Sequence, residues 1–164
     1  MLYVLDQEGK VVKIDIENGN EIIPFAQLQP GLDNMVFDDD GSLYMTNNDE
    51  GWVAQILPNG QAKYLSPGGM IIPQGLAVLP GKNQDAIFHA DLFTMRKFNG
   101  KSGQQEEQYK GFLVPPPGVV SLTLPQNVSA SGDYLVISSF FSSTVQIFEP
   151  ASGQVLEDFA DQVV

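Results

Sequence analysis

The sequence predicts an all-β fold, and three features of its 164 residues support that class. Charged residues make up only 17%, while there are 16 Gly and 11 Pro, a composition poor in helix formers and rich in turn formers. No segment shows helical periodicity over the roughly 11 residues that would indicate a helix. The third feature is an internal repeat of short β-type runs, each unit closing on a glycine turn.

Four β-type runs lead the repeat units. They are LYVLD from Leu2, LYMTN from Leu43, IFHAD from Ile87 and LVISS from Leu135. Their first residues lie 41, 44 and 48 positions apart, whereas the turn glycine of each unit follows after 17, 17, 16 and 18 positions. These glycines are Gly19, Gly60, Gly103 and Gly153. The near-constant internal spacing indicates a structural repeat whose insertions lie in the loops between units.

Further runs complete each unit. The leading runs are followed by VVKIDI, VAQIL, MRKF and VQIF, and after the turns come EIIPF, QAKYL, QEEQY and QVLEDF. In three units a run also precedes the leading one: NMVF, GLAV and NVSA. Four strands in about 40 to 50 residues is the pattern of a β-propeller blade, with the first strand innermost. We therefore predict about four four-stranded blades, the first lacking its inner strand.

The blades are expected to form one partial propeller domain over residues 1–164, divided at 1–30, 31–72, 73–118 and 119–164. A β-sandwich would not repeat the same four-strand order, and a solenoid needs a shorter period. Because a ring needs at least about four blades and commonly six to eight, a blade face should stay exposed at each end. The chain is then part of a six-bladed propeller, or its ring is completed by association, or Asp161–Val164 supplies the missing strand.

Charge and composition limit the partners. Acidic residues outnumber basic ones 20 to 8, so the net charge of -12 disfavours nucleic acid and anionic lipid. There is no Cys, which excludes disulfides and thiolate metal sites. No apolar run approaches the roughly 20 residues of a membrane span, and Met1–Asp6 lacks the basic region of a signal peptide. We expect a soluble chain and leave its compartment undetermined.

Three segments resemble the six-bladed propellers of the SMP-30/gluconolactonase and NHL-repeat superfamily. Asp33–Tyr44 is similar to that group's D-G-M-x-hydrophobic-D-x-x-G-x-L-aromatic unit, and Pro73–Val78 to its P-x-G-L-A-hydrophobic unit. IFHAD before MRKF resembles the Y-V-A-D…R-V-x-x-F of NHL repeats. The superfamily includes lactonases, other hydrolases, lyases and binding propellers, so the resemblance is more specific for the blade than for an activity.

The resemblance implies a site in the central channel. Residues just before the inner strands face that channel in such propellers, which here gives Asp33, Gln74 and Gln126, with Asn34 and Asn127 beside them. In the lactonases a divalent cation, calcium or zinc, is held there by carboxylate and Asn oxygens, and Asp33 matches the ligand aspartate. The cation would polarise a lactone carbonyl and activate a water. The chain departs from the family where Gln74 and Gln126 replace Asn and where the ligand glutamate has no counterpart.

Two functions therefore stay open. One is a metal-dependent hydrolase of a sugar lactone or ester, for which no catalytic residue is assigned. The other is a non-catalytic NHL-type propeller that binds a small-molecule ligand or a protein. A cation near Asp33 would distinguish them.

Other conspicuous residues are expected to be structural. His89, the only histidine, occupies the position of Val4, Met45 and Ile137 in the other units, which indicates a packed core side chain. Asp91 ends its strand as a turn former. Asp38–Gly41 is expected to be a tight turn rather than a calcium loop. The aromatic residues near the turns are expected to pack between blades rather than line a ligand mouth. They are Trp52, Phe93, Phe140 and Phe141.

Two long connections, Ser66–Pro73 and the proline-rich Gly111–Pro117, join the outer strand of one unit to the inner strand of the next. Proline blocks ladder pairing, so the second should be an irregular loop. Both are expected on the face where propellers usually build binding sites.

Overall fold

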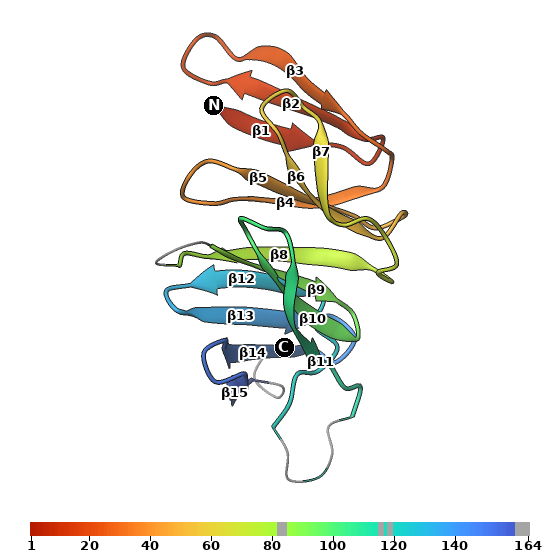
Figure 1. The fold of residues 1–164 in the computed structure, drawn as a ribbon, viewed down its shortest axis with the longest axis vertical. Coiled ribbons are helices and arrows are strands. Elements are labelled where there is room, and N and C mark those ends of the chain that lie inside the picture. Colours follow the sequence, from red (N-terminus) through yellow and green to blue (C-terminus); the bar gives the residue numbers. More distant parts are fainter. Residues whose placement is uncertain (82–84, 115–116, 118–119, 160–164) are drawn as a thin grey trace.

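The computed structural model describes residues 1–81, 85–114, 117 and 120–159, and it shows four antiparallel sheets that follow one another in chain order (Figure 1). The first sheet has three strands, β1 (Leu2–Leu5), β2 (Lys10–Asp15) and β3 (Glu21–Gln27). The second has four, β4 (Leu32–Phe37), β5 (Leu43–Asn47), β6 (Trp52–Ile56) and β7 (Ala62–Ser66).

The third and fourth sheets also have four strands each. The third contains β8 (Pro73–Leu79), β9 (Ala86–Asp91), β10 (Thr94–Asn99) and β11 (Gln105–Lys110). The fourth contains β12 (Asn127–Ser131), β13 (Tyr134–Ser139), β14 (Thr144–Glu149) and β15 (Gln154–Asp158). Strands pair in sequence order within every sheet, so each unit is a meander. The predicted all-β blades, with an inner strand missing from the first, are confirmed.

Two of the predicted segments include residues that the structure does not describe. The strand proposed for Asp161–Val164 lies outside the described residues, as does part of the loop at Gly111–Pro117. The described start of that loop, residues 111–114, has no strand pairing, as predicted. The secondary structure of the described residues is strands and turns, and no helix among them is long and apolar enough to cross a membrane.

The repeat glycines set the hairpin turns. Gly19, Gly60, Gly103 and Gly153 all have positive φ, between 69° and 81°. A side chain is strained in that region of φ, which explains why the same residue returns at the same point of each blade. Turn geometry is thus the local cause of the constant spacing.

Alternating side chains of each blade pack against the blades on either side. In β5, Leu43 and Met45 join the core shared with the first sheet, whereas Tyr44 joins the core shared with the third. All three are at most 2% exposed. A separate apolar core fills the space between the third and fourth sheets. The core is therefore divided into three layers between four sheets.

The inner strands β4, β8 and β12 lie next to one another, with β8 between the other two (Figure 1). Gly75 in β8 donates its backbone N–H to the Gln126 carbonyl oxygen at 2.9 Å. A Cβ on Gly75 would overlap the Val128 nitrogen and lie only 2.7 Å from the Asn127 Cα atom. On the other side, the Thr46 hydroxyl donates to the Gln74 carbonyl oxygen at 3.2 Å. These contacts fix the starts of the inner strands relative to each other.

Candidate functional site

The structure brings two of the predicted channel residues together. Gln126 Nε2 donates to Gln74 Oε1 at 3.4 Å, and Gln126 Oε1 accepts the Phe140 backbone N–H at 2.7 Å. Gln74 is the second residue of β8, Gln126 directly precedes β12, and Phe140 directly follows β13. Gln126 therefore ties two inner strands to a turn of the fourth blade. Both amides are partly exposed and can exchange hydrogen bonds with a ligand.

The two neighbouring asparagines have a local role. The side-chain oxygen of Asn34 accepts the N–H of Met35 at 2.8 Å, and that of Asn127 accepts the N–H of Val128 at 2.9 Å. Asn34 lies where the register of β4 against β5 shifts, between Leu32 and Met35. The side-chain oxygens satisfy backbone donors there, so they are already engaged as acceptors.

Asp33 stands apart from the glutamine pair. Its carboxylate is exposed and accepts a hydrogen bond from the Asn48 side chain. Partial desolvation raises the pKa of Asp33 above its ordinary value, and the hydrogen bond from Asn48 opposes that rise. No interaction between Asp33 and Gln74 or Gln126 is present in the described part of the chain.

The donor set can be compared with what a hard cation needs, which is several oxygen ligands converging on one point. Among the described residues, no three His, Asp or Glu side chains lie together as a metal-binding group. The oxygens of Asn34, Asn127 and Gln126 accept backbone hydrogen bonds. The described residues therefore do not by themselves fit a calcium or zinc site, and the cation remains a prediction that needs further ligands.

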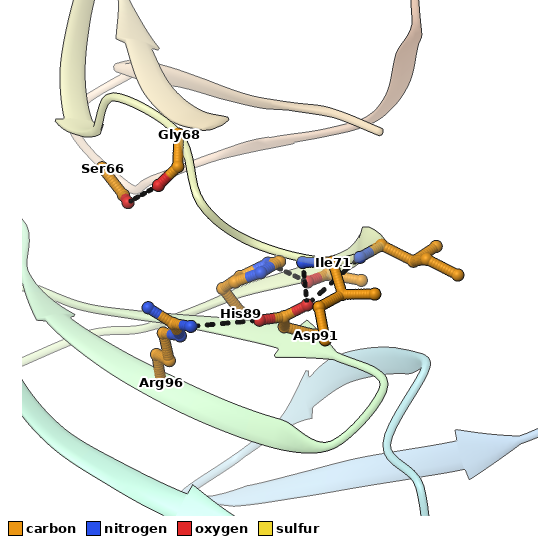
Figure 2. A network of polar contacts seen from close by, with 8 residues as sticks. Ser66, Gly68, Ile71, His89, Asp91 and Arg96 are labelled. Carbon is orange, nitrogen blue, oxygen red and sulfur yellow. Dashed lines mark hydrogen bonds and ion pairs between the residues drawn. The ribbon is translucent and has the colours of Figure 1, made fainter. Parts of the chain in front are cut away.

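A buried polar network lies beside these inner strands, on the third sheet (Figure 2). His89 is fully buried, and its Nδ1 lies 3.2 Å from the Gly75 carbonyl oxygen, to which it donates. Burial lowers the pKa of His89 to about 3, so the ring is neutral near pH 7. Its Nε2 atom has no hydrogen-bond partner among the described residues. The prediction that His89 is a packed core side chain is confirmed.

Asp91 holds a connection in place. Its Oδ1 accepts the N–H groups of Ile71 at 2.8 Å and Ile72 at 3.2 Å, and its Oδ2 accepts Arg96 Nη2 at 3.2 Å (Figure 2). The sequence predicted only a local turn role, and this was incomplete because the backbone that Asp91 binds lies about 20 residues earlier. Asn47, at the same position of the second blade, also binds the connection before its inner strand, but as a donor, to the Pro30 carbonyl oxygen at 2.6 Å. The polar residue that recurs at the end of the second strand of each blade is the sequence feature from which this role could have been inferred.

An acidic cleft of about 670 Å³ lies at the other end of the sheets, between the second and third blades. Asp38 Oδ1 accepts the Ser42 N–H at 2.7 Å, which confirms the predicted turn at Asp38–Gly41. Asp38 Oδ2 accepts the Tyr44 hydroxyl at 3.2 Å. Burial, and then Asp38, raise the pKa of Tyr44 to about 12. The carboxylate of Asp38 is thus used in closing its own turn.

The aromatic residues near the turns divide into two groups. Trp52 is 1% exposed and packs in the core between the first two sheets, as predicted. The same prediction is wrong for Phe93, Phe140 and Phe141, which are 49%, 84% and 56% exposed. These three lie in the turns after β9 and β13, beyond the ends of the strands, and no sheet of the described residues covers them. They are surface residues on the same end of the blades as Gln126.

No family model and no curated protein matches the sequence. Solved structures do match the fold. A chain of a nidogen/laminin complex superposes with a TM-score of 0.77 at 15% identity, covering 95% of this chain and 57% of that one. Virginiamycin B lyase from Staphylococcus aureus gives 0.68 at 13%, covering 99% and 52%. A streptogramin B lyase gives 0.63 at 11%, covering 93% and 48%.

The chain spans about half the length of these similar structures. Identities this low carry the fold and not the activity. The expected SMP-30/gluconolactonase relationship therefore stays a prediction. What the similar structures show is the fold: the four sheets are blades of a β-propeller.

Proposed function

We propose that this chain is a binding part of a β-propeller, and that it recognises a protein through the end of the blades that carries Gln74 and Gln126. We call this end the mouth face. It is formed by the turns after β1, β5, β9 and β13 and by the connections that lead into β4, β8 and β12. The observation that carries the proposal is the exposure of large apolar side chains on the mouth face of the third and fourth blades. They are Ile71, Phe93, Phe140 and Phe141.

Backbone hydrogen bonds link the elements of the mouth face. The N–H of Gly111, in the connection before β12, donates to the Phe93 carbonyl oxygen at 2.8 Å. The connection before β8 is bound to the end of β9 through Ile71 and Asp91. The Gln126 N–H donates to the Ser138 carbonyl oxygen at 3.1 Å. Loops from different blades are thus fixed beside the starts of the inner strands.

The chemistry of this face suits a protein. Exposed apolar and aromatic side chains mark protein-binding surfaces, and aromatic anchors contribute strongly to binding free energy. Phe140 is 84% exposed and contacts the Phe141 ring edge-on at a centroid distance of 5.8 Å. The amides of Gln74 and Gln126 can donate to and accept from a peptide backbone. With a net charge of -12, the chain favours a partner that is not itself acidic.

The similar structures support this choice. One of them is a complex of nidogen with laminin, which is an assembly of proteins. Others are lyases, so the propeller fold alone does not decide between binding and chemistry. What favours binding is the mouth face of this chain, which combines exposed apolar groups with amides and carries no cluster of three or more His, Asp or Glu among its described residues.

A phage-displayed random peptide library provides the test. The purified chain should enrich peptides with apolar anchor residues. Their affinity should fall at least about tenfold for Phe140→Ser, because an aromatic anchor contributes more than about 1.4 kcal/mol. Tyr134→Ser is the matched control, since Tyr134 is 40% exposed on the same blade but begins β13 at the opposite end. Enriched peptides that bind both variants equally well, or no enrichment at all, would contradict the proposal.

The second candidate is the metal-dependent hydrolase of a sugar lactone or ester. The observation in its favour is Asp33, a carboxylate at the start of β4 whose only side-chain partner among the described interactions is an amide. Titration calorimetry with calcium and with zinc is the direct test. Binding that is lost in Asp33→Asn but kept in Asp49→Asn would support a cation site and justify lactonase assays. Absence of binding by the unaltered chain would remove this candidate.

A further inference from the structure

The outward side of the first blade carries an apolar patch, which we call the first-blade face. Its residues lie in register across three strands. Leu2 pairs with Ile14, which pairs with Ile22, and Val4 pairs with Val12. Leu2, Val4 and Ile22 are 50%, 40% and 64% exposed. The opposite side of the same sheet carries Tyr3 and Leu5 and packs on the second blade.

The first-blade face is equivalent to surfaces that are buried inside the molecule. Leu43, Ile87 and Leu135 occupy the position of Leu2 in the later blades, and they are 2%, 0% and 0% exposed. Their cross-strand partners also correspond, because Leu2 pairs with Ile14 as Leu43 pairs with Ile56. A blade therefore belongs on the first-blade face, as one does at each equivalent surface.

The fourth blade has the complementary surface. Val136, Val145 and Ile147 lie on the side of that sheet opposite the core shared with the third blade, and we call them the fourth-blade face. At the position of Ile147 the earlier blades have Lys13, Gln55 and Lys97, each opposite the residue equivalent to Val136. At this position the outward side of the last blade thus carries an apolar residue, where the matching side of the earlier blades carries a charged or polar one.

We propose that the first-blade face binds the fourth-blade face of a second copy of this chain, and that two copies associate head to tail. One chain carries both halves of an interblade interface, and no sheet of the described residues covers either of them. The chain covers 57% and 52% of two propeller chains of known structure, so two copies have about the length of one such chain. Two copies supply about eight blades, which is within the usual range for a closed ring. A head-to-tail pairing that closes also leaves neither face exposed.

The mass of the purified chain in solution, measured by light scattering, tests this pairing. The unaltered chain should have twice the monomer mass of 17.9 kDa. Val4→Glu and Ile147→Glu should each be largely monomeric at the same concentration. A buried glutamate without a partner weakens association more than about tenfold. Ile71→Glu, which alters an isoleucine that is 59% exposed on the mouth face, should stay dimeric.

Mixing the two variants distinguishes head-to-tail pairing from other arrangements. Val4→Glu keeps an intact fourth-blade face and Ile147→Glu keeps an intact first-blade face, so an equal mixture should regain a dimer through one interface. Recovery also demonstrates that both variants are folded. A monomeric unaltered chain would overturn the proposal. So would a dimer that survives Ile147→Glu, because the first-blade face would then pair with itself, and so would a mixture that stays monomeric.

Discussion

The first and second blades present the same residue types at the same positions, yet their surroundings differ. Leu2 and Val4 of β1 are 50% and 40% exposed, whereas Leu43 and Met45 of β5 are 2% and 0% exposed. Both pairs point to the side from which a preceding blade would pack. The comparison teaches that the pattern of a strand specifies which face is apolar, while burial depends on whether a neighbouring sheet is present.

The largest effect should come from adding a charge at the two matched positions. Met45→Glu places a carboxylate in a closed core and should reduce the free energy of unfolding by more than about 3 kcal/mol. Val4→Glu, at concentrations where the chain is monomeric, should change it by less than about 0.5 kcal/mol because its site is open. Urea titrations followed by the fluorescence of Trp52, the only tryptophan, measure both values. Equal losses in the free energy of unfolding for the two variants would contradict the difference in burial between the first and second blades.

A smaller effect on the free energy of unfolding is expected where the inner strands β8 and β12 are in contact. Gly75→Ala introduces a Cβ that overlaps the Val128 nitrogen, which cannot move without shifting β12. We expect a loss of about 2 to 3 kcal/mol, typical of overpacking. Gly41→Asn serves as control, since Gly41 has φ 81° with open space around it and Asn tolerates that conformation. A melting temperature for Gly75→Ala within error of the control would contradict the close approach.

His89 extends the comparison to pH, because it occupies the position of Val4 and Met45 in the third blade. Its pKa is about 3 in the folded chain and 6.5 in the unfolded one. Below pH 6.5 the unfolded chain takes up a proton that the folded chain does not, so stability falls as pH decreases towards 3. The loss at pH 5 should be about 2 kcal/mol.

His89→Met, which introduces the residue of the second blade, should remove this contribution to the pH dependence. Urea titrations of both proteins at pH 7 and pH 5 give the difference. An identical change between the two pH values in the variant and the unaltered chain would show that His89 is not the group responsible.

The smallest effect on stability is expected at the mouth face. Phe140→Ser should change the free energy of unfolding by less than about 0.5 kcal/mol, because the side chain is 84% exposed. The same substitution should abolish most peptide binding if this face is the interaction surface. A loss of stability comparable to that of Gly75→Ala would instead assign Phe140 to the core.

The repeat was sufficient to predict the strands, the missing inner strand and the burial of His89, since each follows from equivalence between blades. It could not predict the environment of Phe93, Phe140 and Phe141, because these lie in turns whose cover depends on connections that differ from blade to blade. The sequence placed Gln74 and Gln126 at the same channel but did not predict the hydrogen bond between them. The partner of Asp91 was missed because a polar residue at a strand end reveals nothing about which distant backbone it binds.

Hydrogen–deuterium exchange of the unaltered chain, measured at low and at high protein concentration, tests most directly whether a second copy of the chain covers the first-blade face and the fourth-blade face. We predict that amides of β1–β3 and β13–β15 become more protected as the concentration rises, while those of β5, β6, β9 and β10 do not change. Protection that is independent of concentration in every blade would contradict the account, because the exposed faces of the first and fourth blades would then have no partner to acquire.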